Sequence, residues 1–118
     1  MKKIVLSVAL AVLLAAPALA QDHSQHSMTG EMSAASKAYM DAMAKMDTDM
    51  KAMTMTGKPG ADFALMMIPH HQSAIDMAKA YLASGENDPE LTKLSNDVVA
   101  AQEKEIAFLK EWLTKNGQ

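Results

Sequence analysis

The residues with the most definite chemistry lie together in one short segment, Met66-Met67-Ile68-Pro69-His70-His71. Met66 precedes His70 by four residues, and Met67 precedes His71 by four, so each pair shares one side of a helix. Imidazole nitrogen and thioether sulfur are both ligands for copper, and the thioether favours Cu(I). The segment therefore predicts a Cu(I) site made of histidine and methionine.

Three helices are expected to position this segment. The first covers about residues 33–53 and carries methionines at 40, 43, 46, 50 and 53, which form one stripe. A turn at residues 56–60 leads to the second helix, at about 61–84, which ends at Gly85 as a C-cap. Asp88-Pro89 begins the third helix, which runs to about residue 115. Short turns between the helices predict antiparallel packing.

The expected copper ligands come from the first two helices. His70 binds the metal with Met66, Met67 or Met77, and Met43 or Met46 adds a thioether from the first helix. His71 lies nearer the centre of the apolar arc of the second helix. On the third helix, Gln102 and Glu105 project from an apolar stripe and need polar partners, since a buried polar group without one is costly. We expect them to pair with the histidines and to orient the imidazoles.

Ordinary packing is the alternative for every one of these residues. Methionine fills irregular core space well, so a methionine stripe is often plain core. A buried histidine can be a hydrogen-bonded core residue. Three features favour ligation instead. Removal of residues 1–20 leaves 98 residues that keep 11 of the 12 methionines. The protein is expected to be exported, to a compartment where copper occurs, and histidines lie on the neighbouring helix.

The N-terminus predicts export. Lys2 and Lys3 precede an apolar run at residues 4–16, and Ala18-Leu19-Ala20 follows, which is typical of a signal peptide cut after Ala20. We therefore expect a periplasmic or secreted protein that does not span the membrane. Residues 21–32 are polar and aperiodic and predict a flexible arm, followed by a helical domain at 33–115.

Composition excludes several classes of function. Removal of residues 1–20 leaves 9 of the 11 basic residues against 14 acidic ones, a net charge of −5, so nucleic acid is not an expected partner. The chain has no cysteine, which excludes disulfides and thiolate metal sites. The core must therefore hold without covalent cross-links.

Cleavage after Ala20 would create a second metal site. The mature chain would begin Gln21-Asp22-His23, and its terminal amine, two backbone amides and the His23 imidazole can bind Cu(II) in a square plane. A soluble polar tail without metal is the alternative for the same residues.

The motifs of the second and third helices resemble a known family. Met67-x-x-His70-His71, the following Ala74-Ile75-x-Met77, Gln102-x-x-Glu105-Ile106 and Trp112-Leu113 are similar to the two blocks of the domain-of-unknown-function 305 family. The resemblance covers about residues 33–115. It implies a small exported ferritin-like helical bundle, with some members similar to the CopM copper-binding proteins, and no established enzymatic reaction. This chain carries one short copy of the domain, so a homodimer is one assembly that would complete it.

The sequence thus predicts an all-α antiparallel bundle of three main helices that buffers, sequesters or delivers copper and is not an enzyme. Copper ions, and a second exported copper-handling protein, are the expected partners. The main alternative is a structural or adaptor bundle without metal. A ferritin-like di-metal oxidase would require Glu-x-x-His on two helices, and the chain has no such motif.

Overall fold

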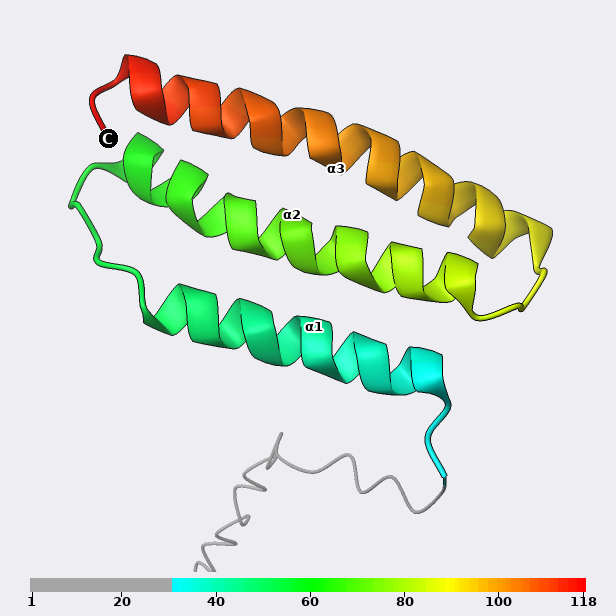
Figure 1. Cartoon of the computed structure of the whole chain (residues 1–118). Helices are drawn as coiled ribbons and strands as arrows, with labels where there is room; N and C mark the ends of the chain where they lie inside the picture. Colours follow the sequence, from blue (N-terminus) through cyan, green and yellow to red (C-terminus); the bar gives the residue numbers. More distant parts are fainter. Residues whose placement is uncertain (1–30) are drawn as a thin grey trace, which may run out of the picture.

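A computed structural model of the chain describes residues 31–118, which form three α-helices and no β-strand. Helix α1 covers Ala34–Lys51, α2 covers Pro59–Ala83 and α3 covers Pro89–Lys115 (Figure 1). The predicted all-α class and the three main helices are therefore confirmed. The predicted signal peptide and all but the last two residues of the predicted arm lie outside the described residues.

Local sequence signals explain most helix ends. The Ser33 hydroxyl accepts a hydrogen bond from the Ser36 amide at the start of α1, and the Asp88 carboxylate accepts one from the Leu91 amide at the start of α3. Gly85 follows the last turn of α2 with φ of 83°, a conformation that glycine adopts without strain. These caps begin and end the helices close to the predicted positions.

The start of α2 differs from the prediction. Pro59 and Gly60 were assigned to the preceding turn, yet both belong to the helix, because proline is favoured at the first helical position. A Cβ atom on Gly60 would lie 3.0 Å from the Trp112 ring, so glycine here permits close approach of α3. The helix then continues through Pro69 as one element.

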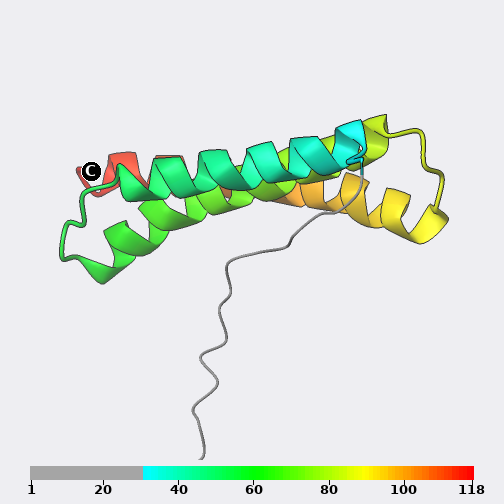
Figure 2. The same ribbon diagram turned by 90° about the horizontal axis from the view of Figure 1, so that it is seen from below.

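The three helices form a single layer with α2 in the centre. Helix α2 packs along both α1 and α3, whereas α1 and α3 do not pack against each other (Figures 1 and 2). Successive helices run antiparallel, as the short connections require. None of the helices described is long and apolar enough to cross a bilayer.

The core of this layer is small. Within residues 31–118, four of the eight buried apolar residues are alanines, and Ile75 is the one large side chain that is fully buried. One cluster joins α2 to α3 through Ala61, Ala64, Leu109 and Leu113. The methionines of α1 are mostly not core, since Met40 and Met43 are 51% and 49% exposed.

Candidate metal centre

His71 lies at the centre of the contact between α2 and α3. Its side chain is buried, and its Nε2 atom lies 2.5 Å from a carboxylate oxygen of Glu105. The two residues are 34 positions apart and meet because α2 and α3 run antiparallel. Glu105 was expected to pair with the histidine pair, and His71 is its partner.

The Glu105 contact determines which ring nitrogen of His71 carries the proton and which one lacks a partner among the described residues. An ionised carboxylate can only accept hydrogen bonds, so Nε2 carries the proton and donates it. In the neutral ring Nδ1 then holds a lone pair. Among the side chains described, no group bonds to this buried Nδ1 atom. An acceptor buried without a partner is costly, and such atoms are frequent at functional sites.

A groove lined by His71 also contains a thioether. Its volume is about 290 Å³. Met67, one helical turn before His71, lines it together with Glu105. The remaining lining is apolar, from Phe63, Phe108 and Leu109. The groove thus brings together a soft sulfur donor, an imidazole and the carboxylate that orients it, among largely apolar side chains.

Met66 and His70 lie on the solvent side of the same helix. Both are exposed, and the His70 ring centre is 6.2 Å from that of His71, with the rings tilted by 58°. His70 was expected to lead the metal binding, with His71 beside it. In the structure His71 is the buried histidine that a carboxylate holds, whereas His70 is exposed.

Three further predicted ligands, Met77, Met43 and Met46, do not line the groove. Met77 is half-buried six residues after His71, about 9 Å further along the helix axis. Met43 and Met46 belong to α1, which does not pack against α3, and neither lines the groove between α2 and α3. His23 lies outside the described residues.

Gln102 does not pair with the histidines as expected. It lies one turn before Glu105, and its buried Oε1 atom has no hydrogen-bond partner within residues 31–118. This amide oxygen on α3 is therefore, like His71 Nδ1 on α2, a buried acceptor without a partner among the described residues.

The donor set suits a soft metal ion. In the part of the chain that the structure describes, no three side chains among histidine, aspartate, glutamate and cysteine lie close enough to share a metal. A carboxylate-bridged di-metal centre needs such a cluster. A site at His71 therefore depends on methionine sulfur, which selects Cu(I).

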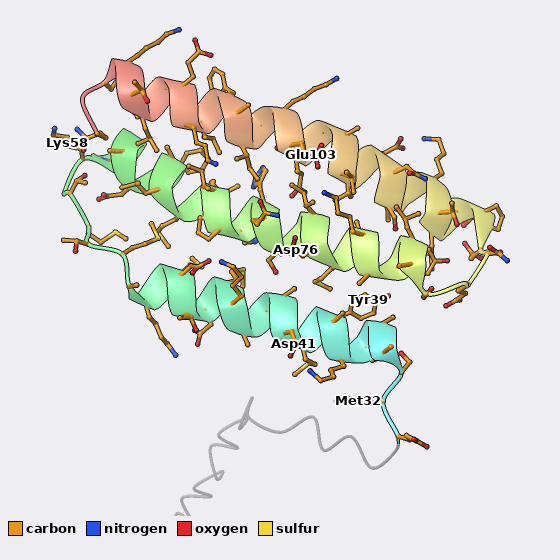
Figure 3. The ribbon with its side chains drawn as sticks, in the orientation of Figure 1. Met32, Tyr39, Asp41, Lys58, Asp76 and Glu103 are labelled. Atoms are coloured by element: carbon orange, nitrogen blue, oxygen red, sulfur yellow. The ribbon has the colours of Figure 1, made fainter. Side chains whose placement is uncertain are left out.

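Charged groups gather elsewhere on the layer. Asp41 of α1 and Asp76 of α2 line the groove between those helices, together with Lys45 (Figure 3). Hydrogen bonding to Asp49, and its charge, raise the pKa of Lys45. An ion pair of 3.0 Å links Lys79 of α2 to Glu103 of α3. None of the residues that line the His71 groove is a lysine.

Phe108 is the lining residue that sequence analysis missed. Phe63 was assigned only to the apolar arc of its helix. Phe108 lies one helical turn after Glu105, so it shares the face that carries this carboxylate. That spacing was the available signal, and it was overlooked because Phe108 lies outside the continuous buried stripe of α3.

Comparison with known proteins identifies the family. The sequence pattern of the family described as "Domain of unknown function (DUF305)" matches residues 9–113, a longer stretch than the expected 33–115. A search of curated proteins found no match. The match covers most of the 118 residues, and the chain therefore belongs to the DUF305 family.

Proposed function

We propose that this chain is an exported copper-binding protein that holds Cu(I) in the groove between α2 and α3. Two observations carry the proposal: the buried Nδ1 atom of His71 lacks a hydrogen-bond partner among the described residues, and His71 and Met67 line the same groove. The Nδ1 lone pair and the Met67 sulfur supply two donors one helical turn apart.

The proposed chemistry follows from these donors. Carboxylates that accept the other ring N–H of a ligating histidine fix its tautomer and make it a stronger donor, and Glu105 is placed to do this for His71. Thioether sulfur favours Cu(I) over Zn(II) and Fe(II). Copper is cargo here, so the role is buffering, sequestration or delivery.

Exposed donors next to the groove support exchange of the ion. Met66 and His70 lie on the outer side of α2 and repeat the methionine–histidine spacing of the buried pair. In a single copy of the chain this pair is open to solvent, so a Cu(I) ion could pass from the groove to it and on to another exported protein. A redundant set of thioether and imidazole donors suits such transfer.

Anaerobic Cu(I) titration in competition with a chromogenic chelator tests the proposal. Met67→Leu removes the sulfur and keeps an apolar side chain of similar size, so we expect affinity to fall about tenfold or more with the helix content unchanged. Met55→Leu, in the exposed loop after α1, is the matched control and should bind as the unaltered chain does.

Selectivity for Cu(I) over Zn(II) is a second test of the proposed function. Zn(II) should bind much more weakly than Cu(I), because the groove offers thioether and few hard donors. Equal or tighter Zn(II) binding, or unchanged Cu(I) affinity in Met67→Leu, would contradict the proposal.

A further inference from the structure

One face of the helix layer is apolar and exposed. Phe63 of α2 and Phe108 of α3 flank the His71 groove and are 61% and 64% exposed. Met66 follows Phe63 by three residues and is 38% exposed. Leu94 precedes Phe108 by 14 residues, within about 40° around α3, and is 57% exposed. We call these four residues the phenylalanine face.

The opposite side of α2 and α3 carries polar pairs. Gln72 lies nine residues after Phe63, about 180° around α2, and donates to Asp76. Lys79 and Glu103 bridge α2 and α3 on that side, since Glu103 lies about 140° around α3 from Phe108. The side of α2 and α3 that carries the phenylalanine face therefore differs in chemistry from the side that these polar pairs occupy.

The exposed area is of the size that a dimer contact needs. Phe63 and Phe108 leave on the order of 250 Å² of aromatic surface in solvent, and Met66 and Leu94 raise the total to roughly 400 Å². A stable interface buries about 800 Å² per partner, of which somewhat more than half is apolar. The phenylalanine face can supply most of that apolar part.

The internal core explains why a second layer is needed. A helical domain normally buries its apolar faces between two layers, whereas α1, α2 and α3 form one. Alanine makes up half of the buried apolar residues in the described region, and the chain has no disulfide to compensate. Small domains in this position are often stabilised by oligomerisation.

We infer that a second copy of this chain packs its phenylalanine face against the first, forming a homodimer in which the two helix layers enclose both His71 grooves. A two-fold contact brings the same patch together from both subunits. Glu105, the carboxylate that lines the groove, is bonded to His71, so the contact does not bring an unpaired groove carboxylate from each subunit together. The dimer does not depend on copper.

Sedimentation velocity on the purified protein, with copper removed by chelator, tests the inference. At tens of micromolar the chain should sediment as a dimer. Phe63→Asp and Phe108→Asp should each sediment as monomers, because an aspartate would lie buried in the apolar contact. Met55→Asp is the matched control, since Met55 is 50% exposed in a loop outside the phenylalanine face, and it should remain a dimer.

Circular dichroism establishes that each variant is folded. If either aspartate variant loses helix, Phe108→Ser replaces it, and we expect its dimer dissociation constant to rise at least about tenfold. A monomeric unaltered chain would overturn the inference, and so would folded Phe63 and Phe108 variants that stay dimeric. A dimer that forms only after Cu(I) is added would also overturn it.

The same samples separate this inference from the copper proposal. A monomer that binds Cu(I) through Met67 would refute the dimer and leave the proposed function standing. A dimer that binds no Cu(I) would do the reverse.

Discussion

The Nε2 atom of His71 and the Glu105 carboxylate meet at 2.5 Å across the contact of α2 and α3. The imidazole is buried, whereas the Glu105 side chain that holds it is 58% exposed. The contact fixes the ring orientation and leaves Nδ1 without a partner among the described residues.

Neutralising Glu105 should weaken copper binding with little effect on folding. Glu105→Gln keeps the side-chain length and an acceptor for Nε2–H but removes the negative charge that strengthens Nδ1 as a donor. We expect Cu(I) affinity to fall by about 10–100-fold, measured by chelator competition. Glu103→Gln, in the exposed pair with Lys79, is the control and should bind normally. Equal affinities in the two variants would contradict the role of Glu105.

The two histidines should behave differently. His71→Ala removes a buried, hydrogen-bonded ring, so we expect it to abolish groove binding and to cost about 1–3 kcal/mol of unfolding free energy. His70→Ala changes an exposed residue and should alter stability by no more than about 0.5 kcal/mol, with a smaller loss of Cu(I) affinity. Urea unfolding and Cu(I) titration on both variants give the comparison. If His70→Ala abolished binding while His71→Ala kept it, the ligand assignment would return to His70.

The methionines outside the groove provide a test of the stripe hypothesis. Met43, Met46 and Met77 should contribute little to the first Cu(I) ion, because none of them lines the groove of His71. The triple replacement of these three by leucine should keep the affinity of the first ion within about threefold, whereas Met67→Leu lowers it about tenfold or more. Native mass spectrometry counts the bound ions. Loss of the first ion in the triple variant would place the site along the α1–α2 stripe instead.

The loop between α1 and α2 should loosen in acid. The Asp62 carboxylate accepts hydrogen bonds from the Thr56 amide at 2.7 Å, from the Thr56 hydroxyl and from the Gly57 amide. Chiefly the Thr56 amide bond lowers the pKa of Asp62 below its ordinary value. Because the folded pKa is the lower one, this stabilisation is complete above the unfolded pKa, near 4, and is lost as pH falls through the folded pKa.

Amide chemical shifts of Thr56 and Gly57, followed by NMR during an acid titration, measure this change. They should move with a midpoint below about 4. Asp62→Asn should remove the transition, whereas Asp47→Asn, in an exposed pair with Lys51, should retain it. A midpoint above the ordinary aspartate value would show that these bonds do not stabilise the loop.

The N-terminal Cu(II) site remains a prediction for residues outside the described part of the chain. Protein that begins at Gln21 should bind one Cu(II) ion with a square-planar visible spectrum, and His23→Ala should abolish that spectrum. His26→Ala, three residues later, serves as the comparison and should retain it. An unchanged spectrum in His23→Ala would exclude this site without affecting the groove.

Local signals in the sequence determined the helices and the chemistry available to them. Ser33, Asp88 and Gly85 act within one turn of their own positions, so the helix ends near them could be predicted without tertiary contacts. The four-residue spacing likewise put Met67 and His71 on one side of α2. Pro59 and Gly60 were misassigned although the signal was local, because proline is favoured at the first helical position.

Tertiary structure decided which histidine is buried and what holds it. His70 and His71 are adjacent, both fall in the apolar arc of α2, and periodicity alone could not choose between them. Helix α3 makes the choice, because it packs along the side of α2 that carries His71 and brings Glu105 to Nε2. The arrangement of the helices in a single layer could not be predicted from the sequence either. An apolar stripe shows that a helix has a face to bury, but it does not show which helix, or which copy of the chain, covers that face.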